Sequence, residues 1–162
     1  MEKYKPQVFI ASSKEGLEIA YSVQELLDND AECTVWDQGI FKPSSYTIPD
    51  LIEQLKKSDN GIFIFSIDDE LKIRNKEEKT IRDNVVLELG LFMGALGPDK
   101  CFIIMPKSTE PVHLPTDLTG MTLLYYNADR KDKNTKAALG PVINQIRNAF
   151  ASNVSLNKQQ IK

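Results

Sequence analysis

Histidine and cysteine are scarce in this chain of 162 residues, and their scarcity narrows the chemistry that it can carry. The single histidine, His113, argues against a zinc site with the usual number of ligands. The two cysteines, Cys33 and Cys101, lie in apolar runs, so we expect buried thiols and no disulfide. A catalytic pair of Cys33 and His113 would need unrelated segments to meet, and we do not favour it.

The chain also lacks an excess of positive charge and any long apolar run. Its formal net charge is −3, whereas proteins that bind nucleic acid polymers usually carry a basic surface. No apolar run approaches the roughly 20 residues that cross a bilayer, and residues 1–6 do not resemble a signal peptide. We therefore predict a cytoplasmic protein with neither a nucleic acid polymer nor a membrane among its partners.

What the chain does contain is a regular alternation of apolar strands with helices. The predicted strands are short apolar runs: Gln7–Ala11, Glu32–Trp36, Gly61–Ser66, Cys101–Met105 and Met121–Tyr126. The predicted helices lie at about residues 16–27, 49–57, 84–96 and 134–151. A charged segment at residues 68–82 and a Pro/Thr-rich segment at residues 106–120 are interpreted as loops.

Strands that are apolar throughout are typical of a parallel sheet with helices on both faces. Five such strands predict an α/β fold of the flavodoxin-like, three-layer class, with a five-stranded parallel sheet in the order 2-1-3-4-5. We assign this domain to residues 1–151 and predict a polar tail at residues 152–162.

The helix predicted at residues 84–96 carries the most unusual residue of the chain. The helix is apolar nearly all round, which is typical of a buried helix, and we interpret its Gly90 and Gly94 as sites of close packing. Glu88 is the one ionisable residue inside it, and a buried lone carboxylate costs several kcal/mol unless it is paired or protonated. Glu88 therefore has a local partner, lies at the edge of a pocket, or serves chemistry, and we favour chemistry.

In a sheet of this order, ligands bind beyond the carboxyl ends of the strands, at the switch point between strands 1 and 3. Ser12 and Ser13 follow the first strand, the loop 37–48 follows the second, and Ser66 follows the third. Glu88 lies in the second turn of the next helix and so stays near the same edge. The sequence therefore predicts one polar site at this edge.

Several segments resemble the TIR domains of bacterial anti-phage effectors: Val8-Phe-Ile-Ala-Ser-Ser13, Glu15-Gly-Leu17, Thr34-Val-Trp36 and Arg82-Asp-Asn-Val-Val-Leu-Glu-Leu-Gly-Leu-Phe92. The likeness is greatest to the TIR domain that precedes a STING domain in cyclic-oligonucleotide (CBASS) defence, and it extends over about residues 7–150. It implies the TIR fold and cleavage of NAD⁺ to nicotinamide and ADP-ribose or a cyclised form of it, with NAD⁺ as the substrate and no separate cofactor. It also implies that Glu88, followed by Leu89, is the catalytic residue.

The same resemblance implies how such an enzyme is controlled. The loop 37–48 corresponds to the family's loop that gates the pocket and mediates self-association between TIR domains. A fused sensor domain would bind a cyclic dinucleotide and stack the TIR domains into an active assembly, and the tail at residues 152–162 would begin the linker to it.

The predicted substrate contacts share a place at the carboxyl edge of the sheet or in the loops beside it: Ser12, Ser13, Trp36, Asp37, Phe41, Ser66, Arg74, Arg82 and Asp83. Each has a structural alternative. Ser12 also fits a capping box with Glu15, Asp83 fits a helix N-cap, and Ser66 fits a turn. The two aromatic residues could stack on NAD⁺, or pack in the core or in an assembly. The two arginines could bind phosphates or lie solvated at the surface.

Two other functions remain open from the sequence. A TIR module that only assembles with other TIR domains would keep the fold without depending on Glu88. An enzyme resembling nucleoside deoxyribosyltransferases would turn over nucleosides and ignore NAD⁺.

Overall fold

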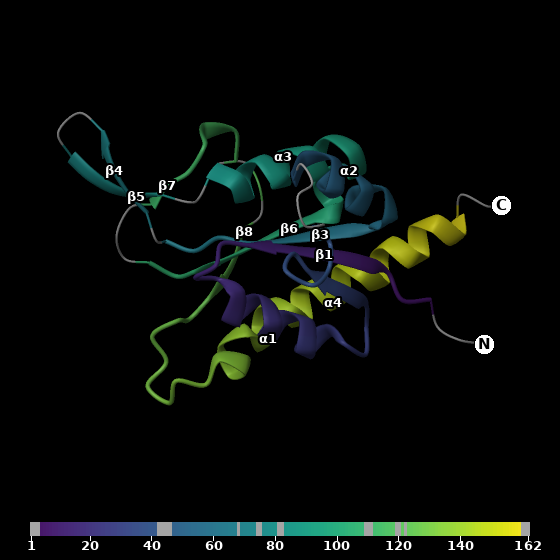
Figure 1. Cartoon of the computed structure of the whole chain (residues 1–162). Coiled ribbons are helices and arrows are strands. Elements are labelled where there is room, and N and C mark those ends of the chain that lie inside the picture. Colours follow the sequence, from purple (N-terminus) through teal and green to yellow (C-terminus); the bar gives the residue numbers. More distant parts are fainter. Residues whose placement is uncertain are drawn as a thin grey trace.

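The computed structural model describes residues 4–41, 47–67, 69–73, 76–80, 83–108, 112–118, 121 and 123–159 (Figure 1). Its main sheet is parallel and consists of β1 (Gln7–Ser12), β2 (Glu32–Val35), β3 (Asn60–Ile64), β6 (Cys101–Pro106) and β8 (Leu123–Tyr126). The spatial order is β2-β1-β3-β6-β8. Counted along the chain, this is the predicted order 2-1-3-4-5, so the predicted sheet is confirmed.

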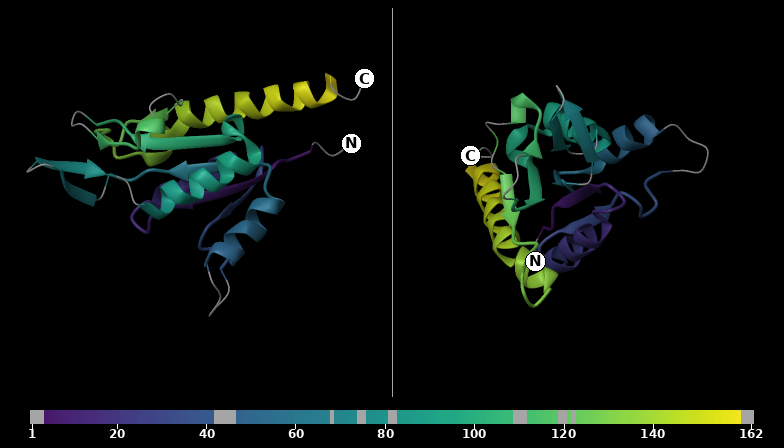
Figure 2. Two further views of the ribbon diagram at one scale, coloured as in Figure 1. Left: turned by 90° about the horizontal axis from the view of Figure 1, so that it is seen from above. Right: turned by 90° about the vertical axis from the view of Figure 1, so that its left-hand side faces the viewer.

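Helices cover both faces of this sheet. The longer ones are α1 (Leu17–Leu27), α2 (Thr47–Lys57), α3 (Asp83–Leu96) and α4 (Thr135–Gln159), and short 3₁₀ turns lie at Pro98–Lys100 (η1) and Thr116–Leu118 (η2). Figures 1 and 2 show α2 and α3 on one face, with α1 and α4 on the other. The three-layer arrangement agrees with the α/β class predicted from the sequence.

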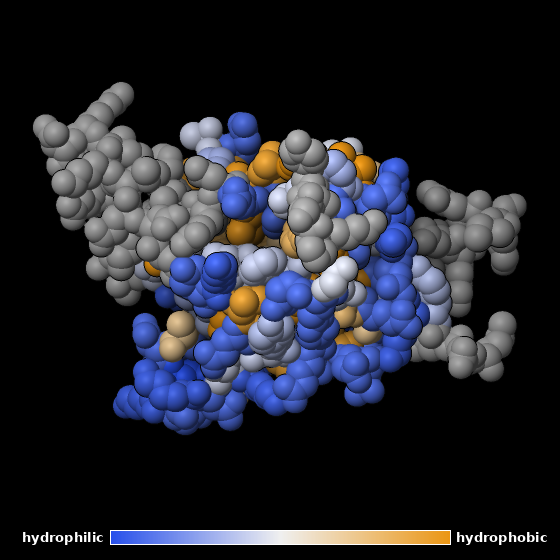
Figure 3. All heavy atoms as spheres, in the orientation of Figure 1, coloured by the Kyte–Doolittle hydropathy of each residue, from blue (hydrophilic) through white to orange (hydrophobic). Residues whose placement is uncertain are grey.

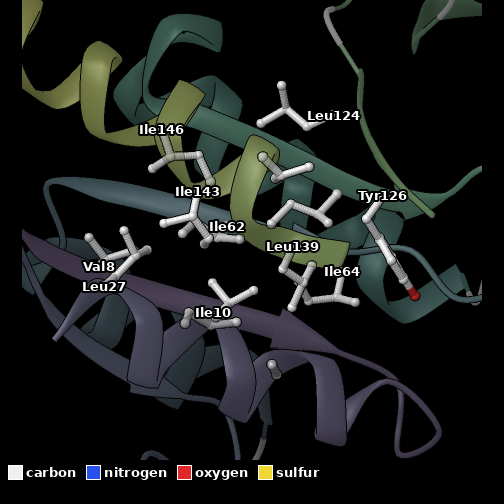
Figure 4. Packing of buried hydrophobic residues seen from close by; sticks show 14 of the residues in the cluster. Val8, Ile10, Leu27, Ile62, Ile64, Leu124, Tyr126, Leu139, Ile143 and Ile146 are labelled. Carbon is white, nitrogen blue, oxygen red and sulfur yellow. The ribbon is translucent and has the colours of Figure 1, made fainter. Parts of the chain in front are cut away.

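Each face has its own hydrophobic core, because successive strand residues point to opposite faces. On the side of α1 and α4, aliphatic side chains of β1 and β3 pack against those of α4 (Figure 4). On the side of α2 and α3, the core is aromatic: the Phe92 ring of α3 stacks on Phe9 at 5.1 Å and meets Phe63 edge-on at 5.5 Å. These buried rings fix α3, and with it Glu88, on the sheet.

A second, three-stranded sheet occupies segments that we interpreted as loops. Its strands are β4 (Asp69–Ile73), β5 (Lys76–Thr80) and β7 (Val112–His113), in that order. The loop predictions for 68–82 and 106–120 were therefore wrong, because strands held by mutual backbone pairing need no apolar alternation. Figure 1 shows this sheet projecting from the end of the molecule at which β1 terminates.

Several helix ends also differ from the predictions. The capping box is wrong: α1 begins at Leu17 with Gly16 at its N-cap and without a side-chain cap, while Ser12 is still in β1. Thr47, within the predicted loop 37–48, is the first residue of α2. At the other end of the chain, α4 continues to Gln159, so part of the predicted polar tail is helical.

The expectation that α3 is buried all round is wrong. Val85, Leu89 and Phe92 form its buried stripe, whereas Leu87 is 53% exposed. Around Gly90 and Gly94, no atom among the described residues lies within 4 Å of the place that a Cβ would take, so close packing does not explain these glycines. Hydrophobic surface is visible on the upper side of the molecule, where α2 and α3 lie (Figures 1 and 3).

Both cysteines are free thiols in this structure, as predicted, with Cys101 buried and Cys33 half-buried. Burial raises the pKa of the Cys33 thiol to about 12 and that of Cys101 to about 11, which keeps them protonated and unreactive. Within the described ranges, no helix is long and apolar enough to span a bilayer.

Two glycine-to-alanine substitutions should have opposite effects on stability. A Cβ at Gly61 of β3 would lie 2.7 Å from the Phe63 ring and 2.9 Å from the Phe92 ring, so Gly61→Ala should destabilise the protein by about 1–3 kcal/mol. Gly90→Ala adds its methyl group in open space on a helix and should stabilise the protein by about 0.5–1 kcal/mol. Urea unfolding measures both changes. A destabilised Gly90→Ala would show that the exposed side of α3 is not open.

Candidate functional site

The ends of β1 and β2 meet through a hydrogen bond between two predicted site residues. Trp36 directly follows β2, and its backbone N–H donates to the Ile10 carbonyl at 3.0 Å. Its indole Nε1 donates to Ser12 Oγ at 2.9 Å. Ser12 is only 8% exposed. The prediction that both residues lie at the carboxyl edge of the sheet therefore agrees with the structure.

Gly16 explains how a second hydroxyl group reaches the same place. A Cβ at Gly16 would lie 2.8 Å from Ser66 Oγ and 3.1 Å from the Ser12 Cβ, so only glycine leaves both serines room. The Gly16 N–H donates to the Ser13 carbonyl at 3.1 Å, which turns the chain from β1 into α1. We missed Gly16 in the sequence, although a glycine just before a predicted helix was the available signal.

The segment that follows β2 contributes aromatic contacts and one carboxylate. The Phe41 and Trp36 rings lie 6.4 Å apart at an angle of 53°. Trp36 is half-buried and packs against both cores of the sheet, as its structural alternative anticipated. Asp37 is exposed and accepts a hydrogen bond from the hydroxyl group of Tyr21 on α1. Asp37 is thus engaged with α1. Ser12 and Ser66 lie against Gly16, Trp36 donates a hydrogen bond to Ser12, and Phe41 lies beside Trp36; we call Gly16 and these four residues the Gly16 cluster.

Glu88 lies on α3, which packs against the face of the sheet opposite to α1 (Figure 1). Its neighbours along α3, Val85 and Leu89, are buried in the core against which Trp36 and Phe41 also pack. Glu88 itself is half-buried, and desolvation raises the pKa of its carboxyl group to about 7. Neither a hydrogen bond nor an ion pair joins it to any described residue. Of the three interpretations of Glu88, a local partner is therefore unsupported within the described part of the chain.

The remaining predicted contacts cannot be assigned to the site. Arg74 and Arg82 lie outside the described residues. Asp83 is placed only by its backbone, as the first residue of α3, so its predicted N-cap position falls one residue earlier. Ser13 is buried beside Ser12. Among the described residues, no three acidic, histidine or cysteine side chains are close enough to hold a metal ion.

These groups can bind and polarise a ligand without a metal ion. A carboxyl group with a pKa of about 7 is partly ionised at neutral pH and can stabilise positive charge that develops beside it. Serine hydroxyl groups both donate and accept hydrogen bonds, which suits the oxygen atoms of a sugar or a phosphate. The arrangement fits a polar ligand that reacts through a cationic transition state.

Comparisons with known proteins identify relatives of this chain. The family model described as "CAP12/Pycsar effector protein, TIR domain" matches residues 7–128. The Pycsar effector protein PaPycTIR of Pseudomonas aeruginosa is 40% identical over 144 residues, which are 88% of this chain and 46% of that protein. CD-NTase-associated protein 12 of Flavobacterium daejeonense is 42% identical over 119 residues, 74% of this chain and 37% of that protein.

This chain spans about half the length of the curated relatives it matches. Among solved structures, the TIR domain of the Toll-related receptor TRR-2 from Hydra magnipapillata is similar, with a TM-score of 0.56 at 19% identity. That match covers 88% of this chain and 96% of the Hydra domain, so the two share a fold.

Replacing Glu88 with glutamine should stabilise the protein more at pH 8 than at pH 5. Burial raises the pKa of the Glu88 carboxyl group in the folded protein from its ordinary value of 4.5 to about 7, so between these pH values the folded protein binds more protons than the unfolded chain. Stability therefore falls as the pH rises through this window. Above pH 7 the substitution should raise the free energy of unfolding by about 1–3 kcal/mol.

Urea unfolding at the two pH values measures this difference. Glu25→Gln, at an exposed carboxylate of α1, serves as the control and should change stability by less than about 0.5 kcal/mol at either pH. If Glu88→Gln changed the free energy of unfolding equally at both pH values, the Glu88 carboxyl group would not be desolvated in the folded protein.

Proposed function

This chain belongs to the family of CAP12/Pycsar effector TIR domains, and we propose that it is an NAD⁺ glycohydrolase, which cleaves the bond between nicotinamide and ribose to give ADP-ribose. The observation that carries the proposal is the Glu88 carboxyl group, which is half-buried and unpaired among the described residues. A fold that only assembled would gain stability by replacing this group with an apolar one.

The chemistry of NAD⁺ suits a single carboxylate. When the bond between nicotinamide and ribose breaks, positive charge spreads onto the ribose in an oxocarbenium-like transition state. Nicotinamide leaves as a neutral molecule, so no general acid is needed to protonate it. Ionised Glu88 would stabilise the developing charge and hold the ribose hydroxyl groups. NAD⁺ is the substrate in this proposal, and no further cofactor takes part.

The Gly16 cluster would bind the rest of the dinucleotide. Ser12 and Ser66 offer hydroxyl groups at the switch point of the sheet, where ligands of such folds bind. Roles for Ser13, Asp37, Arg74, Arg82 and Asp83 in substrate binding stay predictions from the sequence.

Self-association of the domain would switch the enzyme on. The loop 37–48 is the proposed contact, and Ile48, its last residue, is 43% exposed. Ile52 of α2 and Leu87 of α3 are exposed apolar side chains in the same α2–α3 layer. Burying such side chains between copies is favourable.

In the full-length protein, a sensor domain that binds a cyclic nucleotide would bring these copies together in the cytoplasm as part of an anti-phage response. The names of the relatives, which are Pycsar effectors and CD-NTase-associated proteins, support a role in cyclic nucleotide signalling. A STING domain that binds a cyclic dinucleotide is the specific sensor that the sequence predicts.

Nicotinamide release should depend on Glu88 and on clustering. When the domain is concentrated on a multivalent scaffold, Glu88→Gln should reduce the rate of nicotinamide release from NAD⁺ by at least about 100-fold, because charge stabilisation is lost. Glu25→Gln should leave the rate unchanged. No release from any of the proteins, even when clustered, would support a module that only assembles.

The rate should also follow the ionisation of Glu88. The carboxylate is the active form, and the pKa of the carboxyl group is raised to about 7, so kcat/KM should rise with pH below 7 and level off above it. Initial rates of clustered protein between pH 5.5 and 9 at constant ionic strength give this profile. A rate that is flat down to pH 5.5 would contradict a raised pKa in the working enzyme.

A further inference from the structure

We propose that Trp36 is a positioning residue, whose indole N–H orients the Ser12 hydroxyl group toward the dinucleotide while Phe41 holds the indole in place. The inference rests on the proposed function and adds a role for the segment after β2 in binding the substrate. It also replaces the stacking role that the sequence suggests for Trp36.

The hydrogen bond from Trp36 fixes the direction of the Ser12 hydroxyl hydrogen. An indole N–H only donates, and a serine hydroxyl has one hydrogen to donate and two lone pairs to accept with. Because Nε1 of Trp36 donates to Ser12 Oγ at 2.9 Å, one lone pair is occupied and the hydroxyl hydrogen must point away from the indole. Ser12 thereby keeps a directed donor that another acceptor can use.

Both partners of this hydrogen bond are held rigidly. Ser12 is the last residue of β1, and its backbone pairs with Ile64, the last residue of β3. The Trp36 backbone is held by the Ile10 carbonyl, and its ring packs against both cores. The Phe41 ring also lies beside the indole and approaches from the segment that follows β2. The indole therefore cannot turn without leaving packed surface.

Oxygen atoms of the substrate would accept hydrogen bonds from these serine hydroxyl groups. Gly16 packs directly against Ser12 and Ser66, so these two serines, at the end of β1 and after β3, lie together beside the start of α1. Paired hydroxyl donors suit the ribose and phosphate oxygens of a dinucleotide. Those of the phosphates and of the ribose that carries adenine lie outside the reacting ribose, so a contact with them should have the same strength in the bound substrate and in the transition state. Its loss should raise KM and leave kcat nearly unchanged.

The arrangement links self-association to substrate binding. Phe41 belongs to the loop 37–48, which we propose contacts another copy of the domain. A shift of Phe41 would remove packing from one side of the indole, and the Ser12 hydroxyl hydrogen would lose its fixed direction if the indole then turned.

The hydrogen bond can be tested in the free protein, because Trp36 is the single tryptophan of the chain. Its indole N–H gives one resonance in a ¹⁵N-correlated NMR spectrum, and Ser12→Ala should shift that resonance. Ser58→Ala is the matched control: Ser58 is 7% exposed, donates to the Gln54 carbonyl and lies at the opposite edge of the sheet, next to the start of β3. An indole resonance that Ser12→Ala does not move would overturn the proposal without bearing on the proposed function.

A double-mutant cycle on clustered protein tests the role in binding. Trp36→Phe and Ser12→Ala should each raise KM for NAD⁺ about five- to tenfold, the equivalent of one hydrogen bond, with kcat within about twofold of the wild type. The double variant should be no worse than either single variant. Additive effects, or a fall in kcat, would show that Trp36 acts by another route.

Two further measurements separate the possible failures. Benzothienylalanine in place of the single tryptophan keeps the ring but replaces the N–H by sulfur, so it should reproduce the rise in KM even where Trp36→Phe does not fold. A wild-type protein that releases no nicotinamide when clustered would instead overturn the proposed function, and this inference with it.

Discussion

Desolvation of the Glu88 carboxyl group is the constraint on which the candidate site depends. When α3 packs onto the sheet, the aromatic core around Phe92 takes the flanking residues Val85 and Leu89 out of water, and Glu88 is carried partly with them. No described residue pairs with it, and its pKa rises to about 7. Both protonation states of the carboxyl group are then populated at neutral pH, so a small change in its surroundings changes the ionised fraction.

The parallel sheet brings the other residues of the candidate site together. Because all five strands of the main sheet run the same way, the hydroxyl groups of Ser12, at the end of β1, and of Ser66, after β3, lie at one edge, and Trp36 reaches it from β2. Gly16 makes this convergence possible by leaving out a side chain where three elements meet. The site is therefore built from strand ends, whose positions are fixed by the backbone pairing of the main sheet.

The sequence predicts those features that follow from apolar patterning. The five buried strands and their order were recognisable because parallel strands are apolar throughout, and Glu88 was conspicuous as a charge in an apolar helix. Apolar composition could not tell which side of α3 is open, so Leu87 and Gly90 were misjudged. The hydrogen-bond partner of the Ser12 hydroxyl group, Trp36, is 24 residues away in the sequence. The sequence around Ser12 therefore suggested only a capping box, which is a local pattern. The strands β4 and β5 are charged and carry no alternation, and only their backbone pairing reveals them.

The small sheet also has a consequence for the order in which the chain folds. β4 and β5 are neighbours in sequence and form an antiparallel hairpin, which closes early and locally. β7 follows α3 and β6, and its parallel pairing with β5, Lys79 opposite Val112, requires a long loop to close first. Until then the edge of β5 is unpaired and open to strands of other nascent chains. During synthesis, the small sheet is therefore more prone to aggregation than the main sheet.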